Sequence, residues 1–180
     1  ANVDSVKASI DVLASLPGKK VFILGDMGEL GDDAKQCHKE IGEYAGYKNV
    51  NCLLTLGELT QLTSVAFSHA YLNQKANQET NDITSQTKHF TELEPLVKAL
   101  KQQFTPDVFA GKRALSIVVK GSRSAKMEKV VAAIQDWFIE QDAPKSNENT
   151  NEKSNTNLSK ANNETTFDKE SHNNKKEETS

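Results

Sequence analysis

Short apolar runs that alternate with longer helical patterns do most to limit the folds open to this chain. The runs are KVFIL at residues 20–24, NVNCLLTLGE at 49–58 and ALSIVVK at 114–120, and a segment with apolar residues at helical spacing follows each of them. Strands that alternate with helices require crossover connections, which belong to mainly parallel sheets covered on both faces. We therefore predict an α/β fold with a doubly wound, mainly parallel sheet and helices on both faces.

Two helices are predicted around the first strand. The earlier one has Asn2 at the position of an N-cap, ends at Pro17 and Gly18, and has an apolar face formed by Val3, Val6, Ile10 and Leu13. The later one follows a candidate capping pair, Asp33 and Gln36, and has apolar residues at Cys37, Ile41, Tyr44 and Ala45.

The remaining elements continue the alternation. A helix is predicted over residues 58–72, with an apolar face formed by Leu59, Leu62, Val65 and Ala66. Residues 73–87 are polar without a period and are predicted to form an extended surface loop. A short strand at 88–90 and a helix at 92–104, with Pro95 in its first turn, precede the last strand. The apolar stripe of the final helix is Met127, Val130, Val131, Ile134 and Phe138.

The last part of the chain differs in composition from the rest. Only 36% of the whole chain is hydrophobic, because residues 143–180 are almost wholly Asn, Ser, Thr, Lys and Glu, with Leu158 and Phe167 as the only large apolar residues. Such a segment cannot bury enough surface to offset its ordering entropy. We predict one domain over residues 1–142 and a disordered, low-complexity tail over 143–180.

Charge and cysteine usage narrow the class of protein. The formal net charge is −3, so neither nucleic acid nor an anionic membrane is an expected partner, and no apolar run reaches the length of a membrane span. The chain enters a helical pattern at Ala1 without a leader, which is typical of a piece of a longer protein. Cys37 and Cys52 show no metal or redox spacing, which favours buried free thiols in a cytoplasmic protein.

The segments that follow the strands contain the candidate site residues. LGDMGELG, TLGE and KGSRSAKME follow the first, second and last strands, and in a doubly wound sheet they open on the same edge. The glycines of the first segment are three residues apart and match neither a dinucleotide fingerprint nor a phosphate loop. Asp26 and Glu29 would also repel a phosphate, so this loop is not predicted to hold one by itself.

The last of these segments is typical of an anion site. Lys120, Arg123 and Lys126 surround Gly121 and Ser122 at a helix start, which offers cations, a hydroxyl and backbone donors to a carboxylate or a phosphate. The alternative is that both lysines are solvated and that the arginine pairs with a surface acid.

Other polar residues have plainer interpretations beside functional ones. Asp26 and Glu29 fit either a metal or general-base pair or ordinary partners of a helix dipole, and the second interpretation is favoured. His38 has no accompanying ligand cluster and is interpreted as a capping or packing residue. Trp137 and Phe138 are expected in the core or at a helix end.

In order and spacing, the motifs resemble those of the C-terminal domain of the Mur ligases, which form amide bonds in bacterial cell-wall synthesis. ANVDS at the start is similar to the family's Asn-Ala-Asn-Pro-x-Ser, with Val3 in place of the proline. LPGKKVFILGDMGELG with His38 downstream is similar to Leu-Gly-Asp-Met-x-Glu-Leu-Gly, and VVKGSRSAKMEKVV contains the Lys-Gly-Ser-Arg signature. The resemblance covers residues 1–140.

The resemblance implies a Rossmann-like domain of an ATP-dependent ligase that joins D-alanyl-D-alanine to UDP-N-acetylmuramoyl-tripeptide through an acyl phosphate. It implies that ATP and Mg are held mainly by a central domain outside this chain, which also works with an N-terminal domain. Asn2, Asp26 and Met27 would lie on the ATP side, and the dipeptide would be seated by Gly57, Lys120, Ser122 and Arg123. No catalytic residue and no metal ligand is expected in the chain itself, so the isolated chain would be inactive.

Two hypotheses of other classes stay open. One is a stand-alone, non-catalytic module that binds a small anionic ligand at the same edge. The other is a nicotinamide-dependent oxidoreductase, which the absence of G-x-G-x-x-G opposes.

Overall fold

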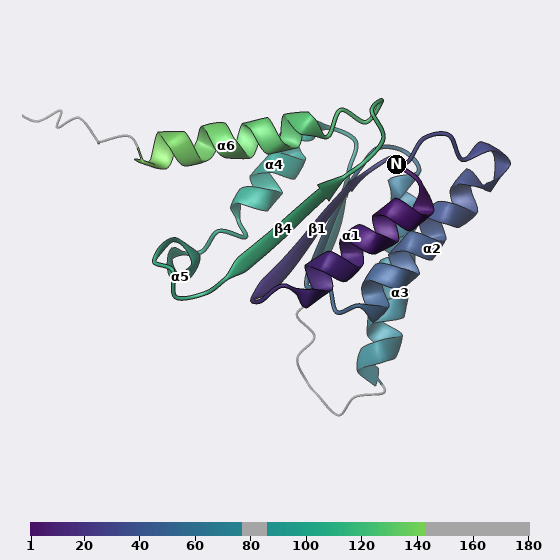
Figure 1. Cartoon of the computed structure of the whole chain (residues 1–180), viewed down its shortest axis with the longest axis horizontal. Coiled ribbons are helices and arrows are strands. Elements are labelled where there is room, and N and C mark those ends of the chain that lie inside the picture. Colours follow the sequence, from purple (N-terminus) through teal and green to yellow (C-terminus); the bar gives the residue numbers. More distant parts are fainter. Residues whose placement is uncertain (77–85, 143–180) are drawn as a thin grey trace, which may run out of the picture. The chain divides into compact units, whose positions relative to one another are not determined.

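The computed structural model describes residues 1–76 and 86–142, which contain a sheet of four strands. The strands are β1 (Lys19–Gly25), β2 (Cys52–Leu56), β3 (Gln86–Phe90) and β4 (Leu115–Lys120). They lie in the order β3-β2-β1-β4 and every neighbouring pair is parallel, which confirms the predicted α/β fold (Figure 1). One compact unit is Ala1–Ala143. The predicted tail lies outside the described residues, so the boundary at residue 142 and the disorder beyond it stay predictions.

Helices cover both faces of the sheet. They are α1 (Val3–Ser15), α2 (Ala34–Tyr47), α3 (Thr60–Ala76), α4 (Leu93–Lys101), the short α5 (Pro106–Phe109) and α6 (Glu128–Asp142), with a 3-10 turn at Gly31–Asp33 before α2. Helices α1, α2 and α3 lie on one face, and α4 and α6 lie on the other (Figure 1).

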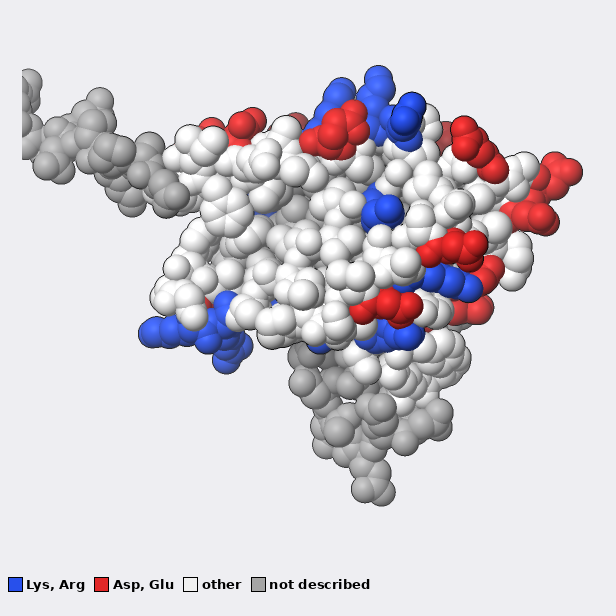
Figure 2. Space-filling model, in the orientation of Figure 1, with Lys and Arg blue, Asp and Glu red and all other residues white. Residues whose placement is uncertain are grey.

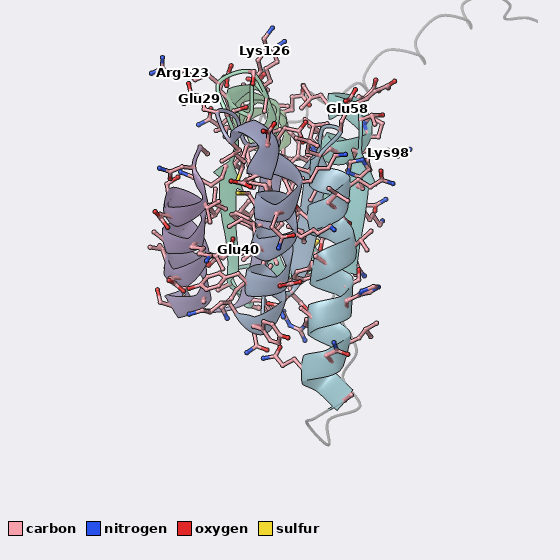
Figure 3. All side chains as sticks on the ribbon, turned by 90° about the vertical axis from the view of Figure 1, so that its right-hand side faces the viewer. Glu29, Glu40, Glu58, Lys98, Arg123 and Lys126 are labelled. Carbon is pink, nitrogen blue, oxygen red and sulfur yellow. The ribbon has the colours of Figure 1, made fainter. Side chains whose placement is uncertain are left out.

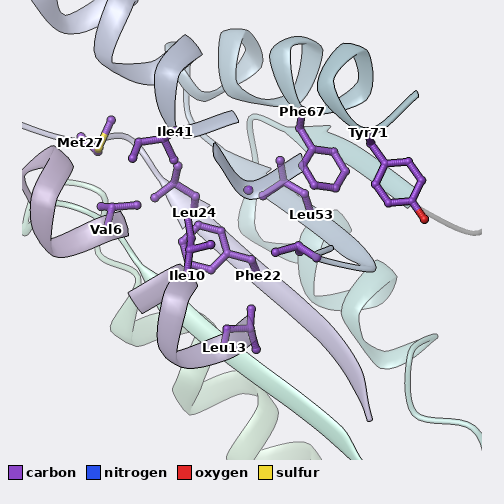
Figure 4. Packing of buried hydrophobic residues seen from close by; sticks show 12 residues of the cluster. Val6, Ile10, Leu13, Phe22, Leu24, Met27, Ile41, Leu53, Phe67 and Tyr71 are labelled. Atoms are coloured by element: carbon purple, nitrogen blue, oxygen red, sulfur yellow. The ribbon is translucent and has the colours of Figure 1, made fainter. Parts of the chain in front are cut away.

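The alternation of side chains along the central strands divides the core between these two faces. Phe22 and Leu24 of β1 pack with α1, α2 and α3, as Figure 4 shows, whereas Val21 and Ile23 pack with α4 and α6. Both sets are fully buried. A strand buried on both faces needs apolar residues at every position, which explains why this strand appears in the sequence as a continuous apolar run.

The packing of α3 against α2 differs from the prediction. Of the predicted apolar face, Ala66 is buried but Val65 is 52% exposed, while Thr60 and Thr63, outside the predicted face, are fully buried. A Cβ atom at Gly42 of α2 would lie 2.2 Å from the backbone oxygen of Thr63, so the two helices approach backbone to backbone. Small and hydroxyl-bearing side chains fit such a contact, and a row of leucine and valine does not.

Three further expectations need correction. Asp33 stands at the N-cap position of α2 but makes no capping bond with its side chain, because the preceding 3-10 turn holds its backbone in the helical region, at φ −82° and ψ −1°. The predicted loop at 73–87 is shorter, since α3 continues to Ala76 and β3 begins at Gln86, and residues 77–85 lie outside the described residues. In the predicted stripe of α6, Val131 is 40% exposed.

Candidate functional site

The order in which successive strands join the sheet reverses between β1 and β4, and the switch-point cavity lies at this place. The chain proceeds from β1 to β2 and β3 on one side, while β4 pairs with the other side of β1. In open α/β sheets, ligands bind where the loops after two such strands diverge. The cavity at this place measures about 620 Å³ and is lined by Ala1, Gly28, Glu29, Ser122, Arg123 and Ser124. Figure 2 shows basic and acidic side chains close together along this upper edge of the domain.

The two loops that border the cavity are joined through their backbones. The N–H of Ser122 donates to the carbonyl oxygen of Asp26 at 2.9 Å. A Cβ atom at Gly28 would lie 3.2 Å from the Cβ of Ser122, and a Cβ atom at Gly25 would lie 2.4 Å from the sulfur of Met127. Glycines at the end of β1 and in the loop after it therefore allow the segment after β4 to pack directly against them.

Ser122 shapes its own turn. Its hydroxyl accepts a hydrogen bond from the N–H of Ala125 at 3.2 Å and lies 2.8 Å from the hydroxyl of Ser124. The side chain of Ser122 is 9% exposed, whereas Arg123 beside it is exposed. The serine thus fixes the turn from which the arginine projects.

Asp26 holds the start of α3. Its carboxylate accepts hydrogen bonds from the N–H groups of Glu58 at 3.0 Å and Thr60 at 2.9 Å. The carboxylate lies next to Gly57, which has a φ of +128°. A Cβ atom at Gly57 would lie 2.4 Å from the Cγ of Asp26, so the contact requires glycine there. Asp26 therefore does interact with the N-terminus of a helix, as the favoured interpretation has it. The helix is α3, however, and not α2, which follows Asp26 in the sequence.

His38 holds the loop after β1 in place from within the core. It is fully buried, its Nε2 accepts the N–H of Met27 at 3.2 Å, and its Nδ1 lies 3.1 Å from the hydroxyl of Thr63. Because Nε2 accepts, Nδ1 carries the proton and donates to the threonine. Burial lowers the pKa of His38, and the nearby carboxylate of Asp26 opposes part of that effect. The neutral imidazole is thus a packing and positioning group.

The start of α1 lies at the same cavity. Asn2 accepts the N–H of Ser5 at 2.9 Å, which confirms the predicted N-cap, and Ala1 lines the cavity. At the other end of this helix, Asp11 accepts from the hydroxyl of Tyr44 at 2.8 Å and pairs with Lys48 at 2.7 Å. These contacts fix α1 on α2 and thereby position the N-terminal residues.

The predicted basic turn is divided between two concave surfaces. Lys120 and Arg123 line a smaller cavity of about 290 Å³ on the other side of the turn, and Arg123 also lines the larger one. Lys126, with φ +49°, lines neither of the two. Among the described residues, none of these three cations forms an ion pair. Arg123 is therefore available to a ligand on either side.

The structure does not bring every candidate to these cavities. Gly57 lies under the cap of α3 and lines neither of them, and the side chain of Met27 is 4% exposed and packs in the core. Among residues 1–76 and 86–142 there is no group of three metal-binding side chains. No helix in the described part of the chain has the length and apolar character needed to cross a membrane. Glu29 lines the larger cavity and was not predicted as a binding residue.

Comparisons with known proteins identify the family. The family described as Mur ligase, glutamate ligase domain, matches residues 1–123. The UDP-N-acetylmuramoyl-tripeptide–D-alanyl-D-alanine ligase of Escherichia coli K12 is 34% identical over 136 residues, which cover 76% of this chain and 25% of the relative. The ligase of the same name from Bacillus subtilis 168 is 32% identical over 133 residues, which cover 73% and 25%. The chain thus spans about a quarter of the length of these relatives.

Solved structures share the fold. MurF from Acinetobacter baumannii superimposes with a TM-score of 0.59 at 23% identity, over 76% of this chain and 26% of that one. The MurF ligase from Thermotoga maritima in complex with ADP gives a TM-score of 0.57 at 18% identity, over 78% and 27%. The motifs, the fold and the match over residues 1–123 agree, and the chain belongs to the Mur ligase family as its C-terminal domain.

Proposed function

We propose that this domain receives the incoming dipeptide in an ATP-dependent ligase that joins D-alanyl-D-alanine to UDP-N-acetylmuramoyl-tripeptide in peptidoglycan synthesis. The observation that carries the proposal is the exposed guanidinium of Arg123, which lines the switch-point cavity and has no ion-pair partner among the described residues. The names of the relatives from E. coli and B. subtilis support the choice of substrates.

The residues at and near the switch-point cavity would have different roles in binding a dipeptide. Arg123 offers the planar fork of donors that matches a carboxylate. Ser122 fixes the turn. Lys120 lines the smaller cavity next to it and adds positive charge from the end of β4. Gly57 acts indirectly, since it gives Asp26 room to order the neighbouring loop.

ATP and Mg would be held mainly by a central domain of the same protein, with an N-terminal domain completing the ligase. This domain is poorly suited to hold triphosphate, because its glycine loop carries Asp26 and Glu29 and matches no phosphate loop. ATP supplies the activation of the tripeptide carboxyl group. Asn2 and the backbone of Asp26 and Met27 would border the nucleotide when the domains close.

The cytoplasm is the proposed location. Cys37 and Cys52 are both free thiols, as expected in a reducing compartment, and burial raises the pKa of the Cys52 thiol to about 11. A protonated, buried thiol of this kind is unreactive.

The joining reaction tests the proposal. The complete protein encoded by the parent reading frame should form the UDP-linked pentapeptide from the two substrates and ATP, detected by mass spectrometry together with phosphate release. The 180-residue chain alone should show neither. Turnover by the chain alone, or a complete protein that rejects D-alanyl-D-alanine, would contradict the proposal, and the second result would favour a non-catalytic module.

A further inference from the structure

Two opposite charges face the switch-point cavity from the two loops that border it. A Cβ atom at Gly28 would lie 3.2 Å from the Cβ of Ser122 on the other loop. Glu29 and Arg123 are the residues that follow Gly28 and Ser122. Both side chains are exposed, both line the cavity, and Figure 3 shows them at the same end of the domain. Neither forms an ion pair with another described residue, including each other.

The backbone at Glu29 is held in an unusual conformation. Its φ of +64° lies in the left-handed region, which is uncommon for a residue with a side chain. The preceding residues are fixed, because the N–H of Met27 donates to His38 and the carbonyl of Asp26 accepts from Ser122. Such conformations persist where surrounding structure enforces them, often at binding sites.

We propose that Glu29 binds the ammonium group of the incoming dipeptide while Arg123 binds its carboxylate. This inference rests on the proposed function, because D-alanyl-D-alanine is a zwitterion with one charge of each sign at its ends. Two extended residues span at most about 7 Å. The cavity of about 620 Å³ is within the range of small-molecule sites.

A carboxylate in the cavity also determines which ligands are rejected. Glu29 repels a purely anionic ligand such as phosphate and gains nothing from a dipeptide whose amine is blocked. The pair of charges therefore selects a free amino acid or peptide over a simple anion. It also fixes which end of the dipeptide lies at which loop, and this orientation places the amine beside the loop after β1.

Blocked dipeptides test each charge separately in the complete ligase. The variant is Glu29→Gln, which keeps the shape and removes the charge, and the matched control is Glu43→Gln, an exposed acid on α2 that lines neither cavity. The probes are D-alanyl-D-alanine as substrate and two competitors of it. N-acetyl-D-alanyl-D-alanine is a competitive inhibitor, and D-alanyl-D-alanine amide, which keeps its reactive amine, competes as an alternative substrate. Glu29→Gly serves as a second variant, because glycine accepts a positive φ and keeps the loop conformation.

We expect the Glu29 variants to weaken only the binding of ligands that have a free ammonium group. Glu29→Gln and Glu29→Gly should raise the dipeptide KM by about tenfold or more, as for loss of a charge-assisted hydrogen bond. They should raise the inhibition constant of the amide, which keeps its ammonium, and leave that of the N-acetyl compound unchanged. Glu43→Gln should change none of these constants.

An unchanged KM for the dipeptide, or equal changes for both competitors, would overturn the role of Glu29. The wild-type ligase separates this failure from that of the proposed function. If the wild type joins the dipeptide and the Glu29 variants behave like it, only the inference fails. If the wild type does not accept the dipeptide, the proposed function fails as well.

Discussion

At Gly57, the lack of a side chain lets the carboxylate of Asp26 reach the backbone of α3. Alanine at this position would have to adopt a φ of +128°, and its Cβ atom would lie only 2.4 Å from the Cγ of Asp26. We expect Gly57→Ala to lower the free energy of unfolding by about 2–4 kcal/mol, from backbone strain and a displaced cap.

Gly111→Ala is the matched control in urea unfolding. Gly111 also has a positive φ, +68°, but nothing lies within 4 Å of an added Cβ atom. Its cost should stay near the backbone penalty alone, about 1–2 kcal/mol. Equal losses at the two sites would show that the contact with Asp26 is not what requires glycine at position 57.

His38 gives the domain a pH dependence of definite sign. Burial lowers its pKa in the folded state below the ordinary value of 6.5, so just below that pH the unfolded chain binds a proton that the folded chain does not. Its contribution to stability is therefore complete above about pH 6.5 and is lost as the pH falls below it, by at most about 1.4 kcal/mol per pH unit.

Urea unfolding between pH 8 and 5.5 measures this slope. His38→Gln should reduce the slope and keep an acceptor for the N–H of Met27. The pKa of His89 is also lowered by burial, so His89→Gln serves as a control that separates the two histidines. A slope that is the same in His38→Gln and in the wild type would contradict the assignment.

At the level of elements, the start of α3 depends on a residue from the loop after β1. Asp26 accepts two N–H groups there, and replacing a capping residue with alanine costs about 0.5–2 kcal/mol per cap. Asp26→Ala should therefore destabilise the domain by about 1–3 kcal/mol and increase hydrogen exchange in the first turn of α3.

Asp33→Ala provides the comparison for Asp26→Ala. Asp33 occupies the N-cap position of α2 without a side-chain capping bond, so its replacement should cost less than about 0.5 kcal/mol. If Asp33→Ala destabilised the domain as much as Asp26→Ala, the caps would have been assigned to the wrong residues.

The sequence predicted the helices and strands better than the contacts between them. The strands were recognisable because buried parallel strands are continuously apolar, and Asn2 was recognisable because its capping bond spans three residues. The hydrogen bond from the N–H of Thr60 to the carboxylate of Asp26 spans 34 residues, and no local pattern indicates it. The buried face of α3 was predicted only in part, because glycines on α2 determine which α3 residues fit.

The site was predicted in part for the same reason. The motifs after β1 and β4 were expected at one edge, since parallel strands end together. That Glu29 and Arg123 share one cavity depends on β4 lying beside β1, and the order of strands in a sheet is set by packing across the whole domain. Single-sequence patterns do not encode that order.

For the whole chain, composition makes one prediction about residues 143–180, which lie outside the described residues. A segment so poor in apolar residues has no core to contribute. A chain truncated after residue 142 should melt within a degree or two of the full chain, by differential scanning calorimetry. A large drop would show that the segment is needed for stability.

In the whole ligase, the cavity between β1 and β4 is proposed to seat the dipeptide through Arg123. Removing a charge-assisted contact costs about 1.5–3 kcal/mol, and Arg123 is exposed and has no ion-pair partner among the described residues. Its loss should therefore affect substrate binding and not folding.

Steady-state kinetics with varied D-alanyl-D-alanine, measured alongside a thermal melt, test this role of Arg123. Arg123→Ala in the complete ligase should lower kcat/KM for the dipeptide by about 10- to 150-fold with an unchanged melting temperature. Arg113→Ala, at an exposed arginine paired with Asp107 at 3.8 Å, should leave kcat/KM unchanged. Unchanged dipeptide kinetics in Arg123→Ala, with a lowered melting temperature, would contradict this role and make Arg123 a structural residue.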